Sequence, residues 1–207
     1  VLFGIQGSGK GTQGKFIAER YGFEIFETGG ELRKLAKEES GLGKKVKEII
    51  EAGHLVSNEV VMEIIENFMT KLSEGKKVMF DGIPRKMEQK ESFDKLMNKL
   101  GRPFLGILIH ISKEEALRRL TTRRLCETCK SVYPASYESD KCECGGKLVT
   151  RADDNPESIK VRLDAYENET TPVIEQYKKE EKMIEINGEQ SIDEVNEEAF
   201  EKLDKIL

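Results

Sequence analysis

A short apolar run that ends in a glycine-rich loop is the feature of this sequence that most constrains its fold. The loop, GIQGSGKGT from Gly4 to Thr12, fits the pattern G-x-x-x-x-G-K and is followed by an amphipathic segment from Lys10 to about Tyr21. In such a loop the backbone N–H groups turn toward phosphate oxygens, the lysine reaches the terminal phosphates, and the following helix adds its positive end. A structural turn would explain the glycines but not Lys10, so we predict a nucleotide-binding loop. Gly11 stands where this pattern usually has Ser or Thr.

The remaining chain alternates between strand-like and helix-like segments. Apolar runs recur at FEIF, KVMFD, FLGILIHI and KMIEI, and helix-like stretches such as Glu59 to Leu72 and Lys113 to Arg124 separate them. This alternation predicts βαβ units in an α/β fold, with a five-stranded parallel sheet and helices on both faces. Two insertions interrupt it: Glu31 to Gly53, which is helix-like, and Leu125 to Thr150, which favours turns and short hairpins. A helix is expected to restart near Pro156.

Composition narrows the classes of function. The chain has 207 residues, of which 35% are charged, and its net charge is only −5. The overall charge therefore does not indicate binding to nucleic acid or to a membrane surface. No apolar run approaches the roughly 20 residues of a membrane helix. We therefore expect one domain with inserted flaps, in the cytoplasm and monomeric. Val1 already lies in a predicted strand, so a few residues are expected to precede it.

A second candidate ligand site follows the strand-like segment VMFD. Asp81 ends this run and is followed by Gly-Ile-Pro-Arg. In an open parallel sheet, ligands bind at the carboxyl ends of the strands, so Asp81 is placed to hold Mg²⁺ directly or through water. The alternative is an aspartate that only caps a turn.

All four cysteines, Cys126, Cys129, Cys142 and Cys144, fall in the second insertion. The first pair has the C-x-x-C spacing of zinc sites, whereas the second is C-x-C, one residue shorter. We favour zinc, held structurally because four ligands leave no open position. Asp140 as a replacement ligand and unliganded thiols remain alternatives.

Several arginines lie near predicted strand ends and insertion borders: Arg33, Arg85, Arg119, Arg123, Arg124, Arg151 and Arg162. Arg119 and Arg123 are four residues apart on a predicted helix and are expected to share a face. A phosphoryl transferase needs fixed positive charges around the transferred group, and arginine offers a bidentate fork.

The order and spacing of six motifs resemble the adenylate kinase family in its bacterial long-lid, zinc-containing form: GIQGSGKGTQ, ETGGELR, GHLVSNEVV, FDGIPR, RRLTTRRLCETC and TRADDNPESIKVR. The resemblance covers essentially the whole chain. It implies a P-loop kinase fold and reversible Mg-dependent transfer, ATP + AMP = 2 ADP, directly in line as a lid and a flap close. It also implies a CORE of residues 1–26, 57–121 and 155–207, an NMP-binding helical flap at 27–56 and a cysteine-bearing LID at 122–154.

The resemblance further implies roles for individual residues. The ATP side would be formed by Gly7, Ser8, Gly9, Lys10, Gly11, Thr12, Arg119, Arg123, Val132, Tyr133 and Glu189. The AMP side would be formed by Thr28, Arg33, His54, Leu55, Val56, Gly82, Ile83, Pro84, Arg85, Gln89, Arg151 and Arg162. The catalytic cations would be Lys10, Arg85, Arg119, Arg123, Arg151 and Arg162. Asp153 and Asp154 would hold the closed lid, with a helix N-cap or a hinge pair as the alternative.

The chain also departs from the family pattern. Gln6 stands in place of a proline, Gly30 in place of an aspartate, and Ser57-Asn58 in place of Pro-Asp. Two other functions compete with this one: a related kinase that acts on CMP, UMP or GMP, and a P-loop protein whose cysteine module binds nucleic acid. The second is disfavoured because the insertion carries Glu127, Glu138, Asp140 and Glu143 beside few basic residues.

Overall fold

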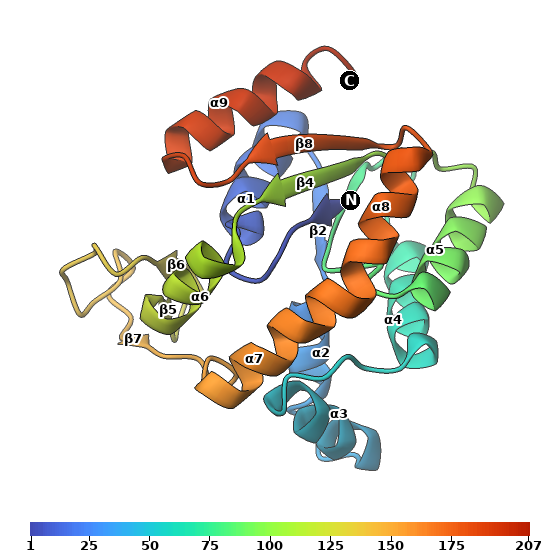
Figure 1. Ribbon diagram of the computed structural model, residues 1–207. Coiled ribbons are helices and arrows are strands. Elements are labelled where there is room, and N and C mark those ends of the chain that lie inside the picture. The colour runs from blue at the N-terminus through green and yellow to red at the C-terminus, as the bar shows by residue number, and fades with distance from the viewer.

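The computed structural model describes all residues, 1–207, and contains a parallel sheet covered by helices on both faces, as predicted (Figure 1). The large sheet has the strand order β2-β3-β1-β4-β8, and every paired neighbour in it is parallel. Its strands are β1 (Leu2–Phe3), β2 (Glu24–Glu27), β3 (Val78–Asp81), β4 (Gly106–His110) and β8 (Met183–Asn187). The helices are α1 (Lys10–Tyr21), α2 (Thr28–Leu35), α3 (Gly41–Glu51), α4 (Asn58–Lys71), α5 (Met87–Lys99), α6 (Lys113–Thr122), α7 (Pro156–Ala165), α8 (Thr171–Lys179) and α9 (Ile192–Leu203).

Successive residues of the central strands point to opposite faces of the sheet, and this alternation builds two cores. Phe3, Phe80 and Leu108 face the larger cluster, which packs against α4, α5 and α8. Their neighbours Leu2, Met79 and Ile107 face a second cluster, with α1 and α9. Both faces are therefore buried, which is why the strands read as continuous apolar runs.

The first insertion is helical. Helices α2 and α3 form it and lie below the sheet in Figure 1. Helix α3 begins where the hydroxyl of Ser40 accepts a hydrogen bond from the N–H of Gly43, and only Gly43 and Val46 of this helix are buried. A helix with so little burial contributes little to the sheet's core.

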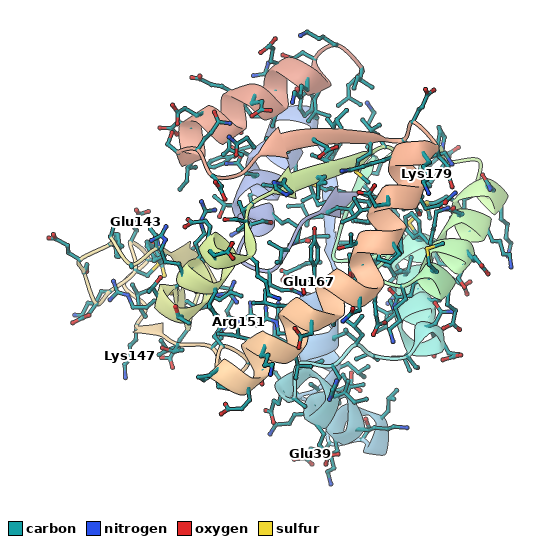
Figure 2. All side chains as sticks on the ribbon, viewed as in Figure 1. Glu39, Glu143, Lys147, Arg151, Glu167 and Lys179 are labelled. Carbon is teal, nitrogen blue, oxygen red and sulfur yellow. The ribbon has the colours of Figure 1, made fainter.

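The second insertion contains a small antiparallel sheet, β6-β5-β7, as its turn-rich sequence predicted. Its strands are β5 (Arg124–Cys126), β6 (Val132–Tyr133) and β7 (Leu148–Val149). The segment projects from the side of the molecule, with Glu143 and Lys147 at its outer end (Figure 2). Its core is a cluster of four buried residues, two of which are cysteines: Cys126, Tyr133, Cys142 and Leu148.

A turn of π-helix, Tyr166–Thr170, joins α7 to α8. Helix α7 begins as predicted at Pro156, and its N-cap is Asn155, whose side chain accepts a hydrogen bond from the N–H of Ser158. The N-cap alternative for Asp153 and Asp154 is therefore wrong.

Candidate active site

The glycine-rich loop leaves the end of β1, the central strand of the large sheet, and leads directly into α1. Gly7 and Gly9 adopt positive φ angles of 87° and 94°, and Gly9 is the N-cap of α1. A Cβ atom at Gly7 would lie 3.1 Å from the carbonyl oxygen of Ala116. Gly7 is therefore favoured for both conformation and space, and Gly9 for conformation alone.

Lys10 is folded back over its own loop. Its Nζ donates hydrogen bonds to the carbonyl oxygens of Gly4 at 2.6 Å and Ile5 at 3.0 Å. Burial lowers the pKa of Lys10 from its ordinary value to about 8, although the nearby Asp81 carboxylate opposes this shift. Elsewhere in the loop, Ser8 is buried with an unpartnered hydroxyl, Gly11 is exposed and Thr12 is half-buried.

The loop after β3 lies beside the glycine-rich loop because β3 pairs directly with β1. The Nε of Arg85 donates a hydrogen bond to the carbonyl oxygen of Gly82 at 2.8 Å, and the N–H of Arg85 donates to Oε1 of the buried Gln89 at 2.8 Å. A Cβ atom at Gly82 would lie 2.6 Å from Nη2 of Arg85, so this glycine makes room for the guanidinium.

A cavity of about 30 Å³ lies between these two loops and the π-helical turn. Its lining includes Lys10, Arg85, Gln6 and Tyr166, together with the neighbouring residues Gly82, Ile83, Pro84 and Thr170. Lys10 and Arg85 thus meet at one cavity, as expected of residues at the carboxyl ends of adjacent parallel strands.

Asp81 ends β3 beside this cavity and is half-buried. Desolvation raises the pKa of its carboxyl group above the ordinary value, and the charges of Lys10 and Arg85 partly offset that rise. Carboxylate oxygen is a ligand that Mg²⁺ accepts, so the chemistry of this position fits the predicted ion.

Three further arginines are held by the carboxylates of Asp153 and Asp154. The carboxylate of Asp154 accepts two hydrogen bonds from Arg123, both at 2.7 Å, and one from Arg162 at 2.9 Å. Its side chain is fully buried. Arg151 donates two hydrogen bonds to Asp153, at 2.9 and 2.6 Å, and lies between the small sheet and α7, facing the middle of the molecule (Figure 2).

Arg119 and Arg123 do not share a helix face, so that prediction is wrong. Helix α6 ends at Thr122, and Arg123 is its C-cap in an extended conformation. Arg119 instead donates hydrogen bonds to Glu115 at 2.6 Å and to the carbonyl oxygen of Gly188 at 3.0 Å. Next to it, Glu189 accepts hydrogen bonds from the N–H and hydroxyl of Ser112, and these bonds lower the pKa of Glu189.

The helical insertion carries the remaining predicted residues. Thr28 begins α2 and is buried, with an unpartnered hydroxyl. Nη2 of Arg33, on the same helix, donates a hydrogen bond to Oε1 of Glu27 at 2.7 Å. His54 to Val56 follow α3; His54 is exposed, whereas Val56 is buried.

The four cysteines converge. All four Sγ atoms lie within 4.8 Å of one another. The shortest separations are 3.5 Å for Cys126 and Cys144 and 3.4 Å for Cys129 and Cys142. A zinc tetrahedron with Zn–S bonds of about 2.3 Å has edges of about 3.8 Å, so the donor set fits the ion.

Asp140 does not take part in this cluster. Its exposed carboxylate accepts a hydrogen bond from Arg124 at 3.2 Å, so the aspartate alternative for the fourth ligand is not supported. Val132 is exposed on β6, whereas Tyr133 is buried and its hydroxyl lies 3.1 Å from Sγ of Cys142.

Sequence reasoning missed several residues around the site. The ion pair of Glu115 with Arg119 could have been predicted, because the two residues are four apart on one helix. Glu27 precedes Arg33 by six residues, a spacing that does not predict a pair. Tyr166 and Thr170 line the cavity from a π-helical turn, which no sequence pattern indicates.

The glycine-rich loop on the central strand of a parallel sheet, with cations gathered at the same edge, defines the class of P-loop kinases. Comparison with known proteins agrees with that class. The model of the family described as adenylate kinase matches residues 2–182. The chain belongs to the adenylate kinase family, whose members are nucleoside monophosphate phosphotransferases.

Relatives from different organisms match over nearly their whole length. The chain is 36% identical to the adenylate kinase of Methanocella arvoryzae over 212 residues, which cover 100% of this chain and 98% of that protein. It is 37% identical to the adenylate kinase of Nitrosococcus oceani, with 94% and 93% coverage, and 37% identical to that of Kosmotoga olearia, with 100% and 99% coverage. No helix of the structure is both long and apolar enough to span a membrane.

Proposed function

We propose that the chain transfers a phosphoryl group directly from Mg-ATP to AMP and back, giving two ADP. One observation carries this proposal beyond family membership. Of the six cations expected in catalysis, only Lys10 and Arg85 lack a carboxylate partner; their side chains bind backbone carbonyl oxygens and line the same cavity. Two half-buried cations with no carboxylate at hydrogen-bonding distance favour an anionic group, and a phosphoryl group in transfer is one.

The two nucleotides approach this cavity from opposite insertions in our proposal. ATP phosphates lie on the loop from Gly7 to Thr12, with Arg119, Arg123, Glu189 and the backbone near Val132 and Tyr133 on the same side. AMP lies over α2 and the loop after β3, with Arg33 and Arg85 toward its phosphate, lined by Thr28, His54, Leu55, Val56, Gly82, Ile83, Pro84 and Gln89. Arg151 and Arg162 lie between the two substrates.

The transfer needs no covalent intermediate on the protein. Lys10 and the arginines stabilise the negative charge that spreads over the transferred group, and the two insertions exclude water when they close over the substrates. Mg²⁺ bound with ATP would be held near Asp81, directly or through water, and would neutralise further phosphate charge.

The cysteine cluster holds zinc in our proposal, through Cys126, Cys129, Cys142 and Cys144. The ion is structural, because four thiolates leave no position open for substrate. The small sheet around it has a core of only four residues, so a metal contributes stability that apolar burial there does not supply. Thiolate ligands require reduced cysteines, which supports a cytoplasmic location.

The assignment of the two nucleotides and the cysteine cluster to different segments supports the expected domains: a CORE of residues 1–26, 57–121 and 155–207, an NMP-binding flap at 27–56 and a LID at 122–154. We propose that the chain works as a monomer, since both nucleotide sides are built from residues of one chain.

The acceptor is tested by measuring phosphoryl transfer from ATP to AMP, CMP, UMP and GMP, each as the sole acceptor. We expect kcat/KM for AMP to exceed the others by orders of magnitude. A preference for another nucleoside monophosphate would overturn the proposed acceptor while leaving the P-loop chemistry in place.

A further inference from the structure

One ion pair of the site differs from the rest in its exposure. Arg123 and Asp154 are 14% and 0% exposed, whereas the side chains of Arg33 and Glu27 are 41% and 54% exposed. The pair is nevertheless close, with 2.7 Å between Nη2 of Arg33 and Oε1 of Glu27. It is therefore the site pair that a ligand arriving from solvent can most easily break.

Glu27 lies at the sheet edge where the substrates are proposed to bind. It is the last residue of β2 and is paired in register with Asp81 at the end of β3. Its backbone caps the start of α2, but its side chain makes no capping hydrogen bond and turns to Arg33 instead. The charge of Glu27 also acts on Asp81, whose pKa is raised mainly by desolvation, and on the guanidinium of Arg85.

Gly30 provides the space for this arrangement. A Cβ atom at position 30 would lie 3.3 Å from Oε2 of Glu27, closer than ordinary van der Waals contact. A Cβ atom at Gly29 would likewise lie 2.9 Å from Nη1 of Arg33. The two glycines in the first turn of α2 therefore leave room for both members of the ion pair, and Gly30 is one of the departures from the family motif.

We propose that Glu27 sets the affinity for AMP by occupying the guanidinium of Arg33 until the phosphate of the acceptor displaces it. The inference rests on the proposed assignment of Arg33 to the AMP phosphate. A carboxylate and a phosphate compete for the same bidentate fork, and the displaced carboxylate then repels the phosphate as a neighbouring negative charge. In this role Glu27 lowers the affinity for a phosphate-bearing acceptor without contacting the base.

The test is the equilibrium affinity for AMP in Glu27→Gln, measured by titration calorimetry at low ionic strength. Since exposed ion pairs are weak, we expect the Kd and the KM for AMP to fall about threefold to fivefold, with the KM for ATP unchanged. The inhibition constant of adenosine, which lacks the phosphate, should not change. Glu24→Gln is the matched control, because Glu24 is exposed at the other end of the same strand and the change in net charge is the same.

The same substitution in an Arg33→Ala variant separates competition for Arg33 from other effects of the Glu27 charge on AMP binding. In Arg33→Ala the AMP affinity should fall, and adding Glu27→Gln should then give a smaller gain than in the unaltered protein, because only the repulsion between Glu27 and the phosphate is left to relieve. Unchanged or weaker AMP binding in Glu27→Gln alone would overturn the inference, since weaker binding would show that Glu27 orients Arg33. If Arg33→Ala binds AMP as tightly as the unaltered protein, the proposed role of Arg33 falls as well, so the two failures are distinguishable.

Discussion

The buried carboxylate of Asp154 offers the sharpest test of how the site is held together. It pairs with two arginines from different segments, Arg123 at the end of α6 and Arg162 on α7. Asp154→Asn keeps the shape of the side chain but leaves both guanidinium groups, 14% and 13% exposed, without this charge. Removing one partner of a buried ion pair costs about 3–5 kcal/mol, and the amide oxygen can still accept a hydrogen bond, so we expect about 3 kcal/mol.

For a chain of this length, a loss of about 3 kcal/mol lowers Tm by about 6–12 °C. The assay is thermal unfolding followed by circular dichroism, with protein and zinc concentrations held fixed because bound metal shifts Tm. Asp140→Asn is the control: it removes the same charge from an exposed side chain that also pairs with an arginine, and it should change Tm by less than about 2 °C. Equal Tm values for the two variants would refute the view that Asp154 stabilises the arginines.

Three further predictions concern the cavity and the cysteine cluster. Lys10→Met and Arg85→Ala should each lower kcat by about 10²–10³ with little change in Tm, as steady-state kinetics and unfolding would show; near-normal turnover would remove these residues from catalysis. Burial lowers the pKa of Lys10 to about 8, and only the charged form attracts phosphate, so kcat/KM for ATP should fall above about pH 8. In Lys10→Arg this fall should move to higher pH. A kcat/KM that does not change with pH in this range would contradict the prediction. Cys142→Ser should lose the approximately one zinc per chain found by metal analysis of protein purified without chelator, whereas zinc retained in full would exclude this thiol as a ligand.

The sheet and both insertions were predictable because their signals are local. Runs such as VMFD and GILIH are apolar on both faces, which in a short segment indicates a buried parallel strand. The turn-rich composition between Leu125 and Thr150 likewise indicated hairpins, and the structure has a three-stranded antiparallel sheet there. The proximity of Lys10 and Arg85 was predictable as well, because neighbouring parallel strands end at the same edge of the sheet.

Contacts between distant residues could not be predicted in the same way. Asp154 lies 31 residues from Arg123, and its pairing depends on where α6 ends, one residue before that arginine. Helix boundaries are poorly determined by sequence, so two arginines at helical spacing were placed on one face when only Arg119 is helical. The shorter C-x-C spacing left the fourth zinc ligand open for a related reason. In the structure the N–H of Gly145, with φ of 83°, donates a hydrogen bond to the carbonyl oxygen of Cys142 at 2.8 Å, and Cys144 lies in the cluster as predicted.

The pairing of the arginines explains how so many cations can lie at one site before any phosphate is bound. Arg119, Arg123, Arg151 and Arg162 each have a carboxylate within hydrogen-bonding distance, which offsets their mutual repulsion. Arg85 has none, and burial lowers its pKa, although a guanidinium remains charged at any ordinary pH. Positive charge without a hydrogen-bonded carboxylate is thus concentrated at the cavity that Arg85 shares with Lys10, where Asp81 is the nearby acidic group. In the proposed function the transferred phosphoryl group is attracted to this charge, so a carboxylate introduced at the cavity should weaken binding of both substrates.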